Sequence, residues 1–324
     1  IAKLPSLIQL NHYFMKSRQE YMDRRKQNGV MNYSESLQER ERKYNECNEQ
    51  SIIRFVPELK RIATMPWREK FTFLRGQSPW CIKDYFGVNS GEECRPHLLA
   101  LTIIVNNQDS YLMEFLDFHL LRGFSHVLVH DLNISDATRE FVQPYVDAGL
   151  VTYIAFTART CHRAVLKGNE HDCLQEMTIH HARMSLRNKT FWLAHFDVDE
   201  YMFPTQGHTL SGILQKFTAM WRQDWPKQLF VPYVLYGTNY HLVRPPGLVI
   251  EAYTRTSTFE ALHGNGKSIS LLDALALDPA VAAIHVYPLR HGLQCKLWVP
   301  SEMKDLLANE LRKMHCWGTA VGEK

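Results

Sequence analysis

The sequence predicts an α/β fold in which a mixed sheet is flanked by helices and preceded by a helical arm. From residue 97 onward, apolar runs of strand length alternate with segments of helical spacing, which is the order of a sheet with parallel strands. One of these runs, residues 191–196, is followed at once by carboxylates. The first part of the chain is charged and helical in spacing. We therefore expect an N-terminal helical arm or stem over residues 1–95 and one domain over residues 96–324.

The individual elements follow from hydrophobic spacing, capping residues and glycine. Strands are expected where apolar residues run together, and helices where they recur every three or four positions. Asp136 is placed to cap a helix, and Gly149 ends the unit that follows. The expected elements are helices at 13–26 and 35–46, then a strand at 98–105, a helix at 111–121, a strand at 127–130, a helix at 136–146, a strand at 150–156, a helix at 170–185 and a strand at 191–196.

The acidic end of the last strand is the most informative feature of the sequence. Asp197, Asp199 and Glu200 follow a buried strand, and Pro204 then breaks the chain direction. In an α/β sheet, side chains at the carboxyl end of a core strand face the crevice where ligands bind. Their oxygens suit Mg²⁺ or Mn²⁺ carrying a phosphate, which indicates a nucleotide-dependent enzyme. The alternative is a solvated turn in which Asp197 and Asp199 only form the turn or cap a helix.

Polar residues also follow the first two predicted strands of the domain. Asn107 and Asp109 come after the first strand, and Asp131 and Asn133 come after the second. In a doubly wound sheet these positions grip a nucleotide base and ribose, although helix capping by Asp109 explains that residue nearly as well. No Gly-x-Gly-x-x-Gly follows the first strand, and no P-loop sequence occurs in the chain. Dinucleotide and P-loop modes of binding are therefore unsupported.

The composition excludes several classes of protein. The net charge is only +3 over 324 residues, whereas a dedicated nucleic-acid-binding protein carries a concentrated basic face, so we expect no nucleic-acid partner. The seven cysteines form no Cys-x-x-Cys pair, which excludes the common zinc ribbons and fingers. No run of about 18 apolar residues is present, and a membrane anchor is expected only in a part of the chain not shown.

Several blocks of sequence occur in a recognisable order. They are Glu-Phe-Leu-Asp-Phe-His-Leu-Leu-Arg-Gly-Phe at 114–124, His-Asp-Leu-Asn-Ile-Ser-Asp at 130–136, Pro-Tyr-Val-Asp-Ala-Gly at 144–149, Phe-Trp-Leu-Ala-His-Phe-Asp-Val-Asp-Glu-Tyr at 191–201, Tyr-Gly-Thr-Asn-Tyr-His at 236–241, Val-Ile-Glu-Ala-Tyr at 249–253, Gly-Lys-Ser-Ile at 266–269 and Ile-His at 284–285. This order resembles glycosyltransferase family 92 and its relatives with the GT-A fold, over roughly residues 97–291. The sequence departs from the family pattern at two places, the triplet at 107–109 and the residues after His285.

The resemblance implies a GT-A fold and a metal-dependent, inverting transfer of a hexose, with galactose favoured, from a UDP-sugar to a glycan acceptor. It implies Mn²⁺ or Mg²⁺ bound by Asp197, Asp199 and His285, with Lys267 reaching the phosphates of the donor. Inversion also needs a carboxylate that takes the proton of the acceptor hydroxyl, and Glu251 is the first candidate. The alternatives for this base are Glu200, Glu260 and Asp273. The resemblance favours the Golgi or the secretory lumen and leaves a cytoplasmic location open.

The sequence also fits two other functions. The first is a phosphotransferase or phosphatase with Asp197 as its nucleophile. Such Asp-x-Asp enzymes usually carry Thr or Val two residues after the second aspartate, where this chain has Tyr201. The second is a non-catalytic member of the fold that binds a sugar nucleotide. Binding of Mn²⁺ and a UDP-sugar separates the three hypotheses, because the phosphatase would ignore the sugar nucleotide and the binding protein would not hydrolyse it.

Overall fold

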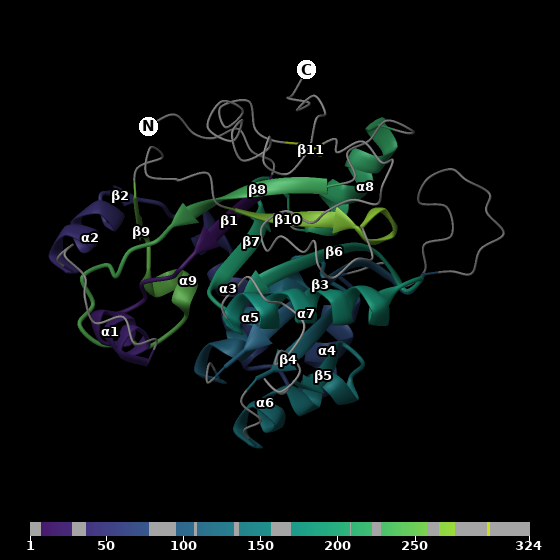
Figure 1. The fold of residues 1–324 in the computed structure, drawn as a ribbon, viewed down its shortest axis with the longest axis horizontal. Coiled ribbons are helices and arrows are strands. Elements are labelled where there is room, and N and C mark those ends of the chain that lie inside the picture. The colour runs from purple at the N-terminus through teal and green to yellow at the C-terminus, as the bar shows by residue number, and fades with distance from the viewer. Residues whose placement is uncertain are drawn as a thin grey trace.

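A large mixed sheet flanked by helices forms the centre of the computed structural model (Figure 1). This confirms the α/β class and the mixed sheet predicted from the sequence. Within the described residues, no helix is both long enough and apolar enough to cross a bilayer. The residues that the structure describes are 8–27, 37–77, 95–106, 109–132, 136–156, 170–207, 209–221, 228–257, 266–275 and 297–298.

The described part of the chain contributes nine strands to this sheet, in the order β5-β4-β3-β6-β10-β8-β1-β7, and β11 pairs with β8. The central strand β3 is buried along almost its whole length, as expected of a strand with neighbours and helices on both sides. A separate pair joins β2 (Cys47–Asn48) to β9 (Arg255–Thr256). The bounds of the nine strands are β1 Ile8–His12, β3 His97–Val105, β4 His126–Asp131, β5 Val151–Ala155, β6 Thr190–Asp197, β7 Glu200–Pro204, β8 Gln228–Leu235, β10 Gly266–Leu271 and β11 Leu297–Trp298.

Strand direction determines which loops lie together. Strands β3, β4, β5 and β6 run parallel. Strand β10 is antiparallel to both β6 and β8, so β8 has the direction of β6, and β1 is parallel to β8. The carboxyl ends of these six strands therefore meet at one side of the sheet, called here the carboxyl edge. Strands β7 and β10 run the other way and begin there.

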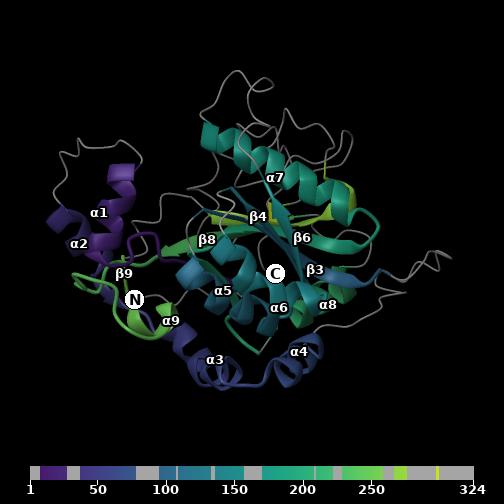
Figure 2. The same cartoon turned by 90° about the horizontal axis from the view of Figure 1, so that it is seen from below.

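Helices cover both faces of the sheet (Figure 2). Helix α7 packs on one face, where Ile179, Ala182 and Leu186 join Leu128 and Leu193 in a small apolar cluster. On the other face, α5 lies in the main core with α6 and α8, and α3 and α4 pack on α5. The bounds are α1 Arg18–Gln27, α2 Leu37–Tyr44, η1 Ser51–Phe55, α3 Val56–Ala63, α4 Trp67–Arg75, α5 Asp109–Leu121, α6 Asp136–Asp147, α7 Glu170–Leu186, α8 Leu210–Trp221, α9 Val249–Ala252 and η5 Leu272–Ala274.

The segment predicted as an N-terminal arm contains helices α1 to α4, but it also supplies a strand of the sheet. Strand β1 lies between β7 and β8, antiparallel to the first and parallel to the second. A buried ion pair attaches α4 to α5, because Lys70 Nζ lies 2.6 Å from Asp117 Oδ2 and 3.0 Å from the Tyr145 hydroxyl. Residues before 95 thus contribute to the sheet and to its core, and the domain boundary at residue 95 stays a prediction.

Candidate active site

The predicted acidic residues lie in and beside the turn between β6 and β7, at the carboxyl edge. Strand β6 ends at Asp197, Asp199 lies in the turn, and β7 begins at Glu200. The turn is attached to the end of β1 by two contacts. The main-chain N–H of Tyr13 donates to the main-chain oxygen of Asp199 at 2.8 Å. The His12 ring nitrogen Nε2 lies 3.6 Å from Asp199 Oδ1.

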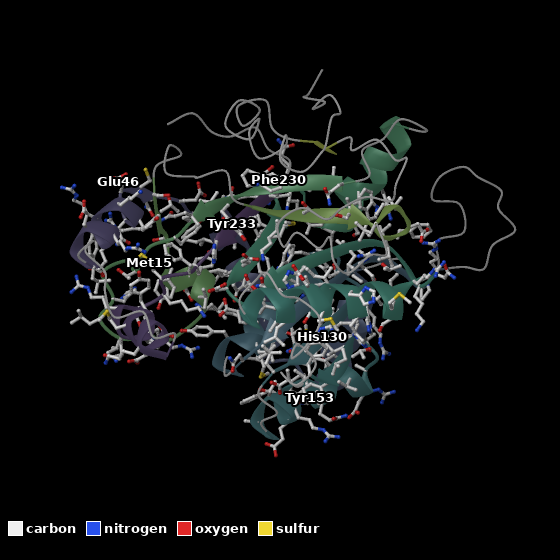
Figure 3. All side chains as sticks on the ribbon, viewed as in Figure 1. Met15, Glu46, His130, Tyr153, Phe230 and Tyr233 are labelled. Atoms are coloured by element: carbon white, nitrogen blue, oxygen red, sulfur yellow. The ribbon has the colours of Figure 1, made fainter. Side chains whose placement is uncertain are left out.

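A buried lysine joins two of these acids. Lys267 Nζ, at the start of β10, lies 3.2 Å from Asp197 Oδ2 and 3.5 Å from Glu200 Oε2. Glu200 also accepts hydrogen bonds from the main-chain N–H of Asp197 at 3.0 Å and from the Tyr233 hydroxyl at 2.6 Å. Tyr233, labelled in Figure 3, comes from β8. The Lys267 and Glu200 side chains are fully enclosed, whereas the Asp197 side chain is 37% exposed. Asp197 is therefore the member of this group that a ligand can reach.

Burial and charge act differently on the three groups. For Asp197, burial raises the pKa, but the Lys267 ammonium and two histidines outweigh it and hold the pKa well below its usual range. Burial raises the pKa of Glu200 to about 8, with Lys267 opposing and Asp197 adding to the shift. Burial lowers the pKa of Lys267, but the two carboxylates reverse this and raise it. Near neutral pH the group therefore keeps a carboxylate at Asp197 and an ammonium at Lys267.

A divalent cation suits the chemistry of this turn. Mg²⁺ is commonly bound by one or two carboxylates together with substrate phosphates, and Asp197 offers solvent a carboxylate that stays ionised. Asp199 is nearly buried, with a side chain 7% exposed. Within the described ranges, no three His, Cys, Asp or Glu side chains are grouped to hold a metal ion. The third predicted ligand, His285, lies outside the described residues.

The residues predicted to bind the nucleotide are only partly described. Asp131 ends β4 at the same edge as Asp197, is fully buried, and accepts a hydrogen bond at 2.8 Å from the hydroxyl of Tyr153, which is labelled in Figure 3. Asp109 begins α5, but its side chain is not among those described. Asn107 and Asn133 lie outside the described residues. The register places Asp131 beside Val105 and Asp197 beside Ile104, so β4, β3 and β6 end at the same level.

The candidates for the catalytic base fall in different places. Glu200 is enclosed within the Lys267 group. Glu251 lies on α9, where its Oε1 is 2.7 Å from Lys60 Nζ of α3, and its side chain is 42% exposed. Asp273 lies in η5 and pairs with Arg95 at 2.6 Å. Glu260 lies outside the described residues. The described contact of the Glu251 carboxylate is with Lys60, and its role as the base stays a prediction.

Sequence reasoning missed His12 and Tyr233 as neighbours of the acids, and it missed how Glu114 acts. The Glu114 carboxylate accepts the main-chain N–H groups of Val249 and Ile250 at 2.8 and 3.3 Å, which fixes the start of α9. Burial raises the pKa of Glu114 to about 7, although these two hydrogen bonds oppose the shift. No local pattern could reveal these contacts, because 135 residues separate Glu114 from Val249.

Glu114 leads to a prediction about pH and stability. Because its pKa is raised in the folded state, its contribution to the free energy of unfolding is full below the ordinary value of 4.5 and is lost as the pH rises through about 7. Urea denaturation between pH 4.5 and 8 should therefore show a smaller loss of stability with rising pH in Glu114→Gln than in the wild type. The same substitution at Glu140, an exposed residue of α6, serves as the control. Parallel profiles for Glu114→Gln and the wild type would contradict this.

Comparison with known proteins identifies the family. No curated protein matches the chain significantly. The sequence model of glycosyltransferase family 92 matches residues 100–269, just over half of the chain. The matched range contains the acidic turn as well as Asp131, Glu251 and Lys267. The chain therefore belongs to glycosyltransferase family 92 and is a glycosyltransferase.

Proposed function

We propose that the protein transfers galactose from a UDP-sugar to a glycan acceptor, with inversion and with a divalent metal ion, on a GT-A fold. The observation that carries this proposal is the acidic turn at the carboxyl edge of the sheet in a member of family 92. There an exposed, ionised Asp197 lies 3.2 Å from the buried ammonium of Lys267. Carboxylate oxygens beside a fixed positive charge suit a nucleoside diphosphate leaving group.

Each predicted residue has a role in this proposal. Asp197 and Asp199, with His285, would hold Mn²⁺ or Mg²⁺, which when bound neutralises charge on the departing diphosphate. The enclosed Lys267 ammonium offsets the negative charge of Asp197, and its positive charge would attract the phosphates without direct contact. Glu200 holds Lys267 and the main chain of Asp197 in place. The base and ribose of the donor would be bound at the ends of the first two domain strands, by Asn107, Asp109, Asp131 and Asn133.

The general base in this proposal is Glu251, which predicts a defined kinetic result. Glu251→Gln should retain donor binding and lose transfer by about two to four orders of magnitude, the usual contribution of a positioned base. Lys60→Met is the matched control, because it breaks the same ion pair and leaves the carboxylate in place. Calorimetry with UDP measures donor binding, and steady-state assays measure the rate of transfer. If the two variants lose transfer equally, the ion pair matters and not the base; if Glu251→Gln transfers normally, another carboxylate is the base.

The phosphatase and binding-protein hypotheses predict other results for the same protein. Family membership supports sugar transfer over a phosphatase with Asp197 as its nucleophile. A non-catalytic protein would bind a UDP-sugar with Mn²⁺ and leave it intact. Incubation with UDP-galactose and Mn²⁺, followed by quantification of UDP, tests the proposal: release of UDP that increases with a glycan acceptor is expected, and binding without release would contradict it.

A further inference from the structure

The loop after β8 leaves the sheet beside the acidic turn. Strand β8 ends at Leu235, and the main-chain N–H of Tyr236 donates to the main-chain oxygen of His12 at 3.0 Å. The His12 ring in turn lies 3.6 Å from Asp199 Oδ1. Residues 237–248, called here the β8 loop, therefore begin at the carboxyl edge. In the proposed reaction, an acceptor hydroxyl has to arrive at this edge.

The β8 loop exposes a group of apolar side chains beside arginines. Tyr240, Leu242 and Val243 are 50%, 63% and 66% exposed. Arg244 is exposed as well, and the guanidinium of Arg255 lies 5.9 Å from the centre of the Tyr240 ring. Ligand sites combine apolar and aromatic surface with a few polar groups that fix orientation, and this patch has that composition.

The backbone at Tyr240 adopts a conformation that is unusual for an aromatic residue. Asn239 and Tyr240 have φ of 51° and 63°, in the left-handed region that bulky residues rarely occupy. Lys16, in the segment that follows β1 at the same edge, has φ of 50°. Such strain persists only where the surroundings over-determine it, and it gathers at functional sites.

Hydrogen bonds from Asn239 hold this conformation. Its Nδ2 donates to Ala252 O and to Thr254 Oγ1, both at 3.1 Å. Its Oδ1 accepts the main-chain N–H groups of Thr254 and Arg255 at 3.2 and 2.8 Å. Its own N–H donates to Asn45 Oδ1 at 2.8 Å. The exposed Tyr240 ring is therefore carried on a fixed backbone.

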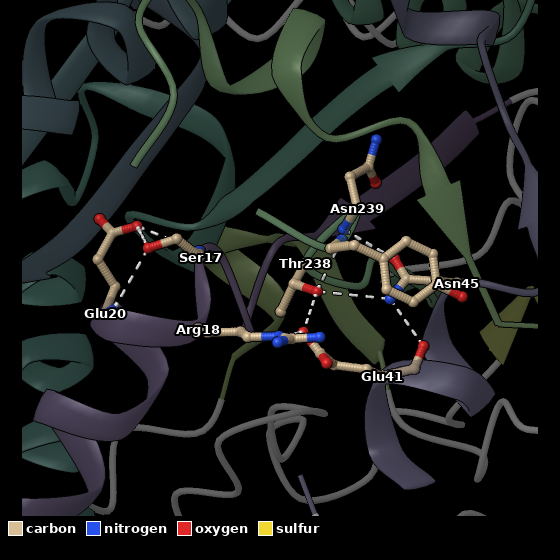
Figure 4. Close-up of polar contacts among 8 residues, drawn as sticks. Ser17, Arg18, Glu20, Glu41, Asn45, Thr238 and Asn239 are labelled. Atoms are coloured by element: carbon tan, nitrogen blue, oxygen red, sulfur yellow. Dashed lines mark hydrogen bonds and ion pairs between the residues drawn. The ribbon is translucent and has the colours of Figure 1, made fainter. Parts of the chain in front are cut away.

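A buried carboxylate connects the same loop to the N-terminal helices (Figure 4). Glu41 of α2 is 1% exposed and accepts hydrogen bonds from Arg18 Nε and Thr238 Oγ1, both at 2.6 Å. The main-chain N–H of Arg18 donates to the main-chain oxygen of His241 at 2.9 Å. Helices α1 and α2 thus hold the loop from outside the sheet. These polar contacts fix the loop against the rest of the protein, while the side chains of Tyr240, Leu242 and Val243 face solvent.

Resting on the sugar transfer proposed above, we propose that the β8 loop is an acceptor-binding platform on which Tyr240 stacks against a pyranose ring of the glycan. A pyranose has an apolar C–H face and a rim of hydroxyls. The Tyr240 ring can cover the C–H face, and the Arg255 guanidinium beside it can donate hydrogen bonds to the hydroxyls. A loop that is already rigid loses little entropy on binding. The loop begins at the carboxyl edge, the side of the sheet at which Asp197 ends β6.

Tyr240→Ala, Tyr240→Phe and Tyr240→Gly test this inference, with Phe141→Ala as the control. Phe141 is a 40% exposed aromatic residue on α6. The probes are the methyl glycosides of galactose, glucose, mannose, fucose and N-acetylglucosamine. Saturation-transfer NMR, with and without UDP and Mn²⁺, measures their binding. At least one glycoside should bind the wild type, Tyr240→Phe and Phe141→Ala alike. Its binding should weaken by about tenfold in Tyr240→Ala and Tyr240→Gly.

Stability and donor binding separate this result from misfolding and from failure of the proposed function. Glycine adopts positive φ without strain, so Tyr240→Gly should melt no lower than the wild type while it loses the glycoside. Calorimetric binding of UDP with Mn²⁺ should be retained in all four variants. If the wild type does not bind UDP with Mn²⁺, the result counts against the proposed function and not against the platform. Equal glycoside binding by Tyr240→Ala and the wild type would overturn the platform. It would also be overturned if the wild type bound none of the glycosides. Vesicle binding or dimerisation that depends on Leu242 and Val243 would overturn it as well.

Discussion

Asp197→Ala is expected to lower metal-dependent sugar transfer by at least about two to three orders of magnitude, the loss measured when one group that stabilises the developing charge is removed. The Asp197 side chain is 37% exposed and ends a strand, so its removal leaves no cavity in the core. Lys267 keeps its second partner, Glu200. We therefore expect a folded protein with little activity. Asp199→Ala should have the same effect on activity.

Transfer assays at several Mn²⁺ concentrations, with circular dichroism of each variant, measure this effect. Asp147→Ala is the control, because Asp147 is an exposed aspartate at the end of α6. Asp197→Asn keeps the shape of the side chain and removes its charge, and it should lose activity as alanine does. A folded Asp197→Asn protein with nearly normal transfer would show that the charge at this position is not used.

Lys267→Met is expected to reduce the free energy of unfolding by about 3 kcal/mol, the lower end of the cost of removing one partner from a buried ion pair. The Lys267 and Glu200 side chains are 1% and 0% exposed. Burial raises the pKa of Glu200 to about 8, so the effect is measured at pH 9, where loss of the ammonium leaves an ionised Glu200 without a counter-ion in the interior. The lower end applies because Asp197 is partly solvated. Methionine fills most of the volume of the lysine side chain, so the effect reports the charge.

A double mutant identifies the source of this loss. At pH 9, Lys267→Met combined with Glu200→Gln removes both buried charges and should recover part of the stability that Lys267→Met alone loses. Lys60→Met is the matched control on the surface, where the loss of the pair with Glu251 should cost less than about 1 kcal/mol. Urea denaturation of the four proteins gives the values. Wild-type stability in Lys267→Met would mean that the ion pair does not hold the turn together.

The sequence predicted the parallel half of the sheet well. The apolar runs at 98–105, 127–130 and 150–156 correspond to β3, β4 and β5, and the helical spacing between them corresponds to α5 and α6. These elements are buried on their apolar faces, so hydrophobic periodicity records their environment directly. The acidic run also ends a strand as predicted, since β6 closes at Asp197.

Strand β1 could not be predicted from its own sequence. Its residues Ile-Gln-Leu-Asn-His include polar side chains that point toward other elements. Asn11 is fully buried and donates hydrogen bonds to the Tyr13 and Tyr236 hydroxyls at 3.3 and 2.9 Å. A polar side chain in the interior is stable only when partners distant in sequence satisfy it. Apolar and polar residues do alternate at 8–11, but over so few positions that the pattern alone does not predict a strand of the central sheet.

The same limit applies to the candidate site. The acids were found because they follow a strand in the sequence, whereas His12, Tyr233 and the contact of Glu114 with α9 depend on how distant segments pack. Lys267 entered through the family resemblance, and the structure shows its physical position between Asp197 and Glu200. Residue type and local order predict candidate ligands, but the partners that tune them come from tertiary structure.

Hydrolysis of nucleotide sugars tests the proposed donor site most directly. Purified protein would be incubated with UDP-galactose, UDP-glucose or GDP-mannose, with Mn²⁺ or with a chelator, beside the Asp197→Asn variant. The proposal predicts release of UDP from UDP-galactose in the presence of Mn²⁺, with none in the chelator or in Asp197→Asn. Hydrolysis that persists in the chelator, or hydrolysis of none of the three nucleotide sugars, would contradict a metal-dependent UDP-sugar transferase.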